Sequence, residues 1–143
     1  MKRPPLEWDA LVEGQQFGPY DYHVDQKVVA SLRASVGDES LVLFDGEPVA
    51  PATILTFPFL QLLESAYVPP PGVIHASQEF DLLAPVRVGS TLTCTGTLTA
   101  KYIRRSRRYF TLAAQAVDER GVTAARSRTT GLYPTVDLRR TGG

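Results

Sequence analysis

The sequence predicts an α+β fold in which one long antiparallel sheet wraps around a central buried helix. Two observations predict it: the first half of the chain carries apolar residues at helical spacing, and the second half switches to alternating apolar and polar residues. A helix layer on an antiparallel sheet lets each layer bury the apolar face of the other. The chain has 143 residues, 43% hydrophobic and 21% charged, which suits a single packed domain.

We expect one domain over residues 1–143, with its core at about 10–134 and a polar tail at 135–143. The only cysteine, Cys94, cannot form an internal disulfide, and no secretory signal follows the basic start. No segment reaches the roughly 20 apolar residues that a bilayer span needs. We therefore expect a cytoplasmic protein without membrane contact.

The charge balance hides an asymmetry. The chain carries 15 basic and 15 acidic residues, but residues 1–50 hold 4 bases and 9 acids, whereas residues 101–143 hold 10 bases and 3 acids. A basic C-terminal region on a neutral chain indicates a local surface that faces an anion or only water.

The first half begins with a segment from Phe17 to His23 that could supply an edge strand. Asp25 can then cap a short amphipathic helix that Gly37 ends. The apolar positions of this helix follow helical spacing: Val28, Val29, Leu32 and Val36. A loop from Asp38 to Pro48 is expected to follow.

The most apolar stretch predicts a buried helix from Pro51 to Tyr67, with Pro51 in the first turn. Large apolar residues cover most of its circumference: Ile54, Leu55, Phe57, Phe59, Leu60, Leu62 and Leu63. A helix that is apolar on most sides is expected to be wrapped by other elements. Pro58 must either kink it or move its start to about Thr56.

Four strands are predicted after this helix, two of them within Ile74 to Leu83 and Val122 to Tyr133. The other two alternate most clearly, and their apolar members are Leu92, Cys94, Gly96 and Leu98, followed by Phe110, Leu112, Ala114 and Ala116. In the last strand Arg126 and Arg128 share the face opposite its small residues. A half-covered sheet leaves an edge and an apolar flank, so we expect a dimer that joins two sheets.

This order of elements, together with IHASQEFDLLAPVRVGSTLTCTGTLT, resembles the MaoC-like hot-dog proteins over residues 10–134. The sharpest match is PVRVG at 85–89 before the strand of Leu92, which is similar to the family's P-x-x-x-G-D-x-L turn with Ser90 in place of the acid. The resemblance implies the hot-dog fold. It also implies an acyl thioester ligand, with coenzyme A or phosphopantetheine as part of the substrate and no other cofactor.

Catalytic members of that family hydrate enoyl thioesters or dehydrate 3-hydroxyacyl thioesters with an Asp and a His. Asp38 corresponds to the Asp, but Leu43 stands at the His position, and the family's His-Gly reads Ala50-Pro51 or Pro51-Ala52. The chain is more similar to the N-terminal halves of double hot-dog hydratases and to the non-catalytic partners of heterodimeric dehydratases. Water addition needs a base, an acid and donors for the enolate oxygen, and leucine supplies none of these.

We therefore expect a lyase of the hydratase/dehydratase class that acts alone through Asp38, or the catalytically reduced subunit of such an enzyme. Asp38 follows Gly37, so it can equally be an ordinary loop residue. If it is catalytic, burial beside Phe44 is expected to raise its pKa. The partner is expected to be a second hot-dog chain, identical or different.

Substrate contacts are predicted at the start of the buried helix. The amides of Ala52 and Thr53, just after Pro51, lack helical partners and lie at the positive end of the helix dipole, where a thioester carbonyl can bind. Water or the loop at 38–48 can satisfy the same amides.

A basic hairpin connection, KYIRRSRR at residues 101–108, supplies the second set of predicted contacts: Arg104, Arg105, Arg107 and Arg108. It is either a solvated turn that keeps edge strands apart or a clamp for the phosphates of coenzyme A or the acidic helix of an acyl carrier protein. Neutral overall charge and the absence of an exposed aromatic platform argue against nucleic acid.

Other chemistries have less support. His23 and His75 are far apart in sequence and Cys94 is alone, so no metal site is expected. A hot-dog thioesterase would need a carboxylate on the buried helix, and the only one, Glu64, lies near its C-terminal end, where the dipole disfavours an anion. Reuse of the fold on a natural-product intermediate is a further alternative.

Overall fold

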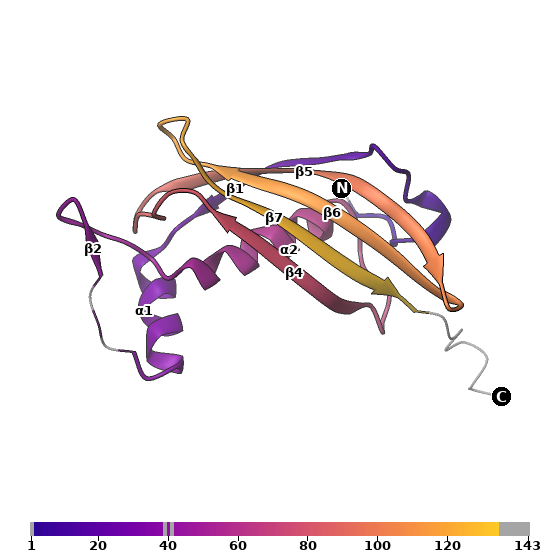
Figure 1. Cartoon of the computed structure of the whole chain (residues 1–143), viewed down its shortest axis with the longest axis horizontal. Coiled ribbons are helices and arrows are strands. Elements are labelled where there is room, and N and C mark those ends of the chain that lie inside the picture. The colour runs from indigo at the N-terminus through magenta and orange to yellow at the C-terminus, as the bar shows by residue number, and fades with distance from the viewer. Residues whose placement is uncertain (1, 39, 41, 135–143) are drawn as a thin grey trace.

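The computed structural model describes residues 2–38, 40 and 42–134; the predicted polar tail, 135–143, lies outside the described residues. In chain order the elements are η1 (Trp8–Ala10), β1 (Gln16–His23), α1 (Gln26–Ser35), β2 (Leu43–Phe44), β3 (Glu47–Pro48), η2 (Ala52–Leu55), α2 (Thr56–Ala66), β4 (Ile74–Leu82), β5 (Thr91–Arg104), β6 (Arg107–Val117) and β7 (Thr123–Tyr133). One antiparallel sheet has the order β1-β5-β6-β7-β4, and α2 lies along one of its faces (Figure 1). The predicted α+β architecture is confirmed.

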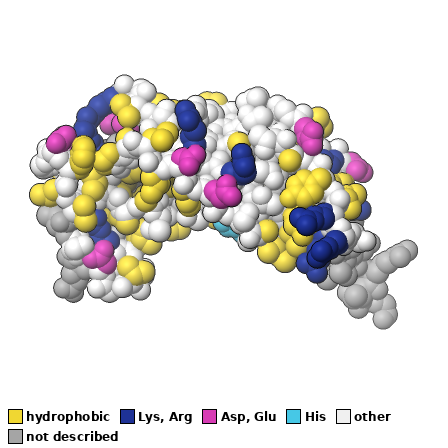
Figure 2. Space-filling model, viewed as in Figure 1, with side chains coloured by type: hydrophobic (Ala, Val, Ile, Leu, Met, Phe, Trp, Pro, Cys, Tyr) yellow, Lys and Arg dark blue, Asp and Glu magenta, His cyan; other side chains and the backbone are white. Residues whose placement is uncertain are grey.

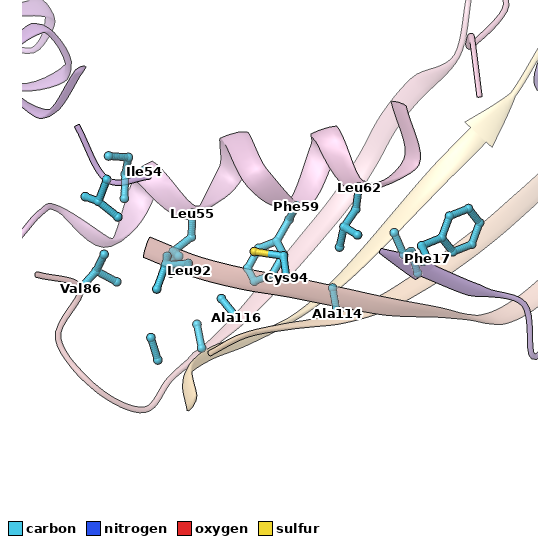
Figure 3. Close-up of a cluster of buried hydrophobic side chains, with 14 of the residues drawn as sticks. Phe17, Ile54, Leu55, Phe59, Leu62, Val86, Leu92, Cys94, Ala114 and Ala116 are labelled. Atoms are coloured by element: carbon cyan, nitrogen blue, oxygen red, sulfur yellow. The ribbon is translucent and has the colours of Figure 1, made fainter. Parts of the chain in front are cut away.

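The central strands follow the predicted alternation. The apolar members of β5 and β6 are buried on the face that carries α2: Leu92, Cys94, Gly96, Leu98, Phe110, Leu112, Ala114 and Ala116. Figure 3 shows Leu55 of η2 and Phe59 and Leu62 of α2 above Leu92 and Cys94 of β5. Each buried side chain of this size contributes roughly 1.5–3 kcal/mol relative to exposure. This shared core fixes the position of α2 on the sheet.

The buried helix starts later than Pro51. A turn of 3₁₀ helix, η2, follows Pro51, and the regular α2 begins at Thr56, so the shifted start was the correct alternative for Pro58. Pro58 lies in the first turn of α2, where a helix needs the fewest backbone donors.

The sheet covers most of the apolar residues predicted for the buried helix, but two of the seven are exposed in the single chain. Phe57 is 43% exposed and Leu60 is 36% exposed. The helix packs mainly against β1 and β5, so the half of the sheet that ends in β4 covers it less. On β4, Ile74 and Leu82 are 54% and 58% exposed, and no strand of the described residues pairs with the outer edge of β4.

The segment before α2 stands off one end of the sheet (Figure 1). Asp25 Oδ1 accepts a hydrogen bond from the Lys27 amide at 2.7 Å, which confirms the predicted cap of α1. The predicted loop at 38–48 contains a short hairpin, β2–β3, whose turn residues Asp45 and Gly46 have positive φ angles of 51° and 77°. That conformation matches a type I′ turn, for which Asp-Gly is a preferred pair.

In the part of the chain that the structure describes, no helix is both long and apolar enough to cross a bilayer. The same residues contain no group of three or more His, Cys, Asp or Glu side chains placed to hold a metal ion.

Candidate functional site

An apolar cavity lies where the chain enters η2. Its volume is about 330 Å³, and its lining residues are Val49, Ala50, Ala52, Leu82, Leu83, Ala84, Pro85 and Val86. We call it the edge cavity, because Leu82 is the last residue of the edge strand β4. The volume falls within the range of roughly 300–1,000 Å³ that is typical of small-molecule sites.

Backbone pairing positions the helix start in the wall of this cavity. The Ala50 amide donates to the Val86 carbonyl at 2.7 Å, and the Leu83 amide donates to the Ala124 carbonyl at 2.9 Å. Within the described residues, neither Ala52 nor Thr53 donates its amide to a backbone carbonyl. The structure thus places Ala52, at the start of a helical segment, in the wall of an apolar cavity, whereas Pro51 and Thr53 are not among its lining residues. The substrate contact expected of these three residues stays a prediction.

A second, larger space lies along α1. This α1 groove has a volume of about 850 Å³ and is lined by His23, Asp25, Gln26, Val29, Ala30, Arg33, Ala34, Gly37, Asp38, Ser40, Pro48, Val88 and Gly89. His23 and Asp38 flank the two ends of α1, and a ten-residue helix is about 15 Å long. They therefore do not form an acid–base pair, although both line the groove. Asp38 lines this groove, whereas Ala52 lines the edge cavity.

Asp38 has the geometry of a solvated turn residue. Its Oδ1 accepts hydrogen bonds from the Ser40 hydroxyl at 2.6 Å and the Ser40 amide at 2.9 Å. The Ser40 hydroxyl, the Ser40 amide and the charge of Arg33 hold the pKa of Asp38 below its usual value. The expectation that burial beside Phe44 raises this pKa is wrong, because the carboxylate is fully exposed. A lowered pKa makes Asp38 a weaker base.

Leu43, at the position where the resemblance expects a His, lies on β2 and is 54% exposed. The β2–β3 hairpin is attached to the body through Glu47, whose carboxylate lies 2.9 Å from Arg87 and 3.6 Å from Arg120. Neither imidazole of the chain lies on this hairpin. Among the described residues of this segment, no imidazole takes the place of the expected His.

Arg33 is a positioning residue that the sequence did not reveal. One guanidinium nitrogen donates to the Ser40 carbonyl and the other donates to the Val49 carbonyl, each at 2.7 Å. Val49 lines the edge cavity, so Arg33 connects α1 to the segment that enters η2. The only sequence signal was a basic residue in the last turn of a helix, a common pattern that stabilises the helix dipole.

The predicted basic contacts lie elsewhere. The β5–β6 hairpin carries Arg104, Arg105, Arg107 and Arg108, all exposed, at the opposite end of the sheet from α1 (Figure 1). Figure 2 shows basic side chains gathered beside hydrophobic ones at that end. We call these four residues the arginine hairpin. Leu82, which lines the edge cavity, pairs with Ala125, and Ala125 pairs with Ala116 on β6. Ala116 is nine residues from Arg107. About 30 Å of strand therefore separate the arginine hairpin from the edge cavity of the same chain.

Aromatic residues support the base of the arginine hairpin. Tyr102 and Tyr109 stack with ring centroids 5.2 Å apart, and the Arg108 guanidinium and the Lys101 ammonium lie 5.8 Å and 4.7 Å from the centroid of Trp8. These contacts make the hairpin a rigid extension of the sheet.

The remaining candidate groups do not form a site. Cys94 is buried below α2, and desolvation, with a smaller effect of Asp21, raises its pKa to about 12, so it is not a nucleophile. Glu64, the carboxylate that a thioesterase would use, is exposed in the last turn of α2. His75 is exposed on β4, as expected.

Comparison with known proteins agrees with this architecture. The family model "FAS1-like, dehydratase domain region" matches residues 12–127. The (R)-hydratase from A. caviae involved in PHA biosynthesis is 21% identical, with a TM-score of 0.71 over 87% of this chain and 98% of that chain. A MaoC-like dehydratase from Rhodospirillum rubrum is 19% identical, with a TM-score of 0.68 over 91% and 97% of the two chains.

A structure of a heteromeric complex is also similar. It is the C-terminally truncated HadBC (3R-hydroxyacyl-ACP dehydratase) complex from Mycobacterium tuberculosis, 17% identical, with a TM-score of 0.70 over 86% of this chain and 98% of that chain. No curated protein sequence matches the chain. At these identities the structures show a shared fold, while the family model covers most of the chain.

Proposed function

This chain belongs to the FAS1-like dehydratase family of hot-dog proteins, and from that membership we propose that it binds an acyl thioester in the edge cavity. The acyl chain lies against the apolar walls, and the thioester carbonyl accepts hydrogen bonds from the amides of Ala52 and Thr53. We propose that the chain serves as a catalytically reduced subunit of the hydratase/dehydratase class, with a second hot-dog chain, identical or different, as partner.

The observation that carries this proposal is that Ala52, which lines an apolar cavity, and the adjacent Thr53 donate their amides to no backbone carbonyl among the described residues. A carbonyl that binds two preorganised donors in a site shielded from water gains the electrostatic stabilisation on which acyl chemistry depends. Apolar walls with a few convergent polar groups are also the usual composition of a small-molecule site. The edge cavity therefore has the means to bind and polarise a thioester.

The acid–base machinery is what the chain lacks. Leu43 cannot transfer a proton, and Asp38 is exposed, hydrogen-bonded to Ser40 and lines the α1 groove instead of the edge cavity. Loss of one general acid–base group commonly reduces the rate by a factor of about 10²–10⁴. These features favour thioester binding without efficient chemistry. Where the partner is a different hot-dog chain that carries the Asp and the His, that chain contributes the lyase activity.

The exposed edge of β4 supports a dimer. Ile74 and Leu82 leave apolar surface uncovered on β4, the strand at the end of the sheet. An unpaired edge strand presents free backbone groups to a second strand. Pairing along β4 would continue the sheet and bury this surface.

Two measurements on the purified chain test the proposal. We expect calorimetry to detect binding of butyryl-CoA, which has no double bond to hydrate, and we expect Ala52→Phe, which fills the edge cavity, to abolish it. A matched control, Ala30→Phe in the α1 groove, leaves binding intact. Hydration of crotonyl-CoA by the chain alone is expected to be negligible. Unchanged binding in Ala52→Phe would reject the edge cavity as the site, and efficient hydration that Asp38→Asn abolishes would show an enzyme that acts alone.

A further inference from the structure

The charge of the arginine hairpin is not balanced within the chain. Arg104 lies directly opposite Arg107 in the β5–β6 pairing, and like charges in opposed positions destabilise a strand pair. Arg105, in the turn, has a φ angle of 50°, a conformation that favours Asn or Gly. In the part of the chain that is described, none of the four arginines lies within ion-pair distance of a carboxylate. Glu13 lies at the base of the hairpin, where its carboxylate accepts a hydrogen bond from the Lys101 amide at 3.0 Å.

The face of the hairpin that points away from α2 combines cations with aromatic rings. Phe110 is buried on the face that carries α2, so the alternation along β6 places Tyr109 and Arg107 on the other face. Their partners on β5 are Tyr102 and Arg104, respectively. The two tyrosine rings stack with their centroids 5.2 Å apart. This face therefore presents a guanidinium pair next to an aromatic pair (Figure 2).

Apolar side chains stand exposed among the arginines on both faces of the hairpin. Tyr102 is 41% exposed, and the next residue of β5, Ile103, points to the opposite face and is 65% exposed. A single exposed aliphatic side chain is ordinary, but the residues between Ile103 and Tyr109 are four arginines and one serine. Apolar and tyrosine side chains set among cations match the boundary between the headgroups and the acyl chains of a membrane. Because both faces carry them, the hairpin suits an end-on contact with a surface.

The same sheet face carries a second pair of arginines in a different setting. Arg126 and Arg128 on β7 are exposed, but the residues directly opposite them on β4 are Asp81 and Glu79. Opposite charges in opposed positions favour the strand pair and offset each other. An excess of positive charge is therefore a property of the hairpin and not of the whole face.

The phosphates of a coenzyme A bound in the edge cavity of the same chain do not reach this charge. The pantetheine arm contains about a dozen bonds between the thioester sulfur and the first phosphate, which is roughly 15 Å when extended. The arginine hairpin lies about 30 Å along the strands from the edge cavity.

A single-stranded nucleic acid also fits this surface less well than a lipid does. Such strands stack their bases on the faces of aromatic side chains. Tyr102 and Tyr109 each place one ring face against the other ring. The exposed aliphatic side chain of Ile103 has no counterpart in a nucleic acid, whereas the edge of the hydrocarbon layer of a membrane provides one.

We propose that the arginine hairpin docks this protein on an anionic lipid surface, with the guanidinium groups at the lipid phosphates and with Tyr102 and Ile103 inserted at the level of the headgroups. A peripheral contact of this kind needs exposed apolar side chains beside cations and no segment that spans the bilayer. Each basic residue near an anionic surface strengthens partitioning by roughly fivefold, so the four arginines together give roughly a 600-fold gain. The contact is reversible and sensitive to salt, because the attraction falls off within a Debye length.

Sedimentation with vesicles tests the docking. Vesicles of three parts phosphatidylcholine and one part phosphatidylglycerol are compared with vesicles of phosphatidylcholine alone. The native protein is expected to sediment with the anionic vesicles, to stay in the supernatant with the neutral ones, and to be released from the anionic vesicles by high salt. Native protein that stays in the supernatant with anionic vesicles at low salt, or that binds both kinds equally, would overturn the proposal.

Two variants of equal charge change separate the hairpin from the rest of the face. Arg104→Gln with Arg107→Gln is expected to weaken partitioning into anionic vesicles by roughly 25-fold. Arg126→Gln with Arg128→Gln is the matched control and is expected to partition within about twofold of native at physiological salt, where the Debye length is about 8 Å. Arg128 pairs with Ala113, so about 20 Å of strand separate it from Arg107. Equal effects of the two double variants would overturn docking through the hairpin.

The inserted side chain has its own test. Ile103→Ser is expected to weaken partitioning by about tenfold, because it removes the aliphatic group that enters the membrane. The control is Val36→Ser, which changes an aliphatic side chain that is 74% exposed at the end of α1, and it is expected to partition as the native protein does. Native partitioning of Ile103→Ser would overturn the insertion.

A fluorescent oligothymidylate tests the competing occupant. The native protein is expected to bind it far more weakly than it binds anionic vesicles, and an excess of these vesicles is expected to displace it. Tight binding of the oligonucleotide together with no sedimentation on anionic vesicles would overturn the proposal and assign the arginine hairpin to a nucleic acid.

Discussion

Arg33 donates a hydrogen bond to the carbonyl of Val49 over 2.7 Å, and this bond connects α1 to the wall of the edge cavity. The same guanidinium holds the Ser40 carbonyl, so one side chain organises the connection between α1 and η2. The α1 groove and the edge cavity are separate. Arg33 lines the α1 groove and hydrogen-bonds to Val49, which lines the edge cavity.

Arg33→Met is expected to weaken butyryl-CoA binding and to lower the free energy of unfolding by about 1–3 kcal/mol, because it leaves the buried Val49 carbonyl without its donor. Arg33→Lys, which can restore only one of the two bonds, is expected to fall between native and Arg33→Met. Denaturant unfolding and calorimetry measure the two effects. Stability and affinity equal to native in Arg33→Met would show that the bond does not position the cavity.

Gly131→Ala is expected to destabilise the protein by about 1–3 kcal/mol through overpacking. A Cβ at Gly131 would lie 2.3 Å from Cζ of Phe110, whose ring covers this glycine from the neighbouring strand β6. Phe110→Leu makes room for the methyl group. It should therefore lower the free energy of unfolding less in the Gly131→Ala variant than in the native protein. Thermal unfolding of the four proteins measures this coupling, and additive effects would contradict the contact.

Cys94 is expected to react with thiol reagents only when the protein unfolds. Burial raises its pKa from an ordinary value of 9.0 to about 12, so the folded state favours the neutral thiol. The resulting stabilisation is fully present below pH 9.0 and is lost as the pH rises toward 12. Labelling at pH 8 should follow the rate of opening in denaturant, and fast labelling of the native protein would contradict the burial.

An antiparallel pair of two β4 strands centred on Gln78 would place Asp81 opposite the partner's His75, and this register predicts a charge effect on dimerisation. His75→Asp places a carboxylate opposite the partner's Asp81 and is expected to weaken the dimer, since each of the two opposed pairs is worth roughly 0.2–1 kcal/mol. Adding Asp81→His again places a carboxylate opposite an imidazole, so the double variant should recover the affinity of the dimer. Sedimentation equilibrium measures both, with His75→Gln as the neutral control. A dimer that is unaffected by His75→Asp would exclude this register.

The alternation of apolar and polar residues was sufficient to predict β5, β6 and β7, because both faces of these strands have a fixed environment within one chain. Phe57 and Leu60 were predicted buried and are exposed, since the sequence records apolar surface without distinguishing burial in the chain from burial against a partner. The β2–β3 hairpin was missed although Asp45-Gly46 is a strong turn signal, because each strand has only two residues.

Some features of the candidate site could likewise be predicted from local sequence, and others could not. The helical start after Pro51 could be predicted because such a start exposes its amides wherever it lies, while a substrate contact at Ala52 and Thr53 stays a prediction. The separation of the arginine hairpin from those amides depends on the direction and length of β5 and β6, which local sequence does not specify. The lowered pKa of Asp38 arises from Ser40 two residues away, a local turn that is as common in loops as in active sites.

The most direct test of the account is amide NMR of Ala52 and Thr53 during titration with butyryl-CoA. A thioester carbonyl that accepts hydrogen bonds from these two donors should move both amide proton resonances downfield, with saturation at the dissociation constant found by calorimetry. Saturable binding that leaves both resonances unchanged would contradict the central claim that the start of the helical segment holds the thioester.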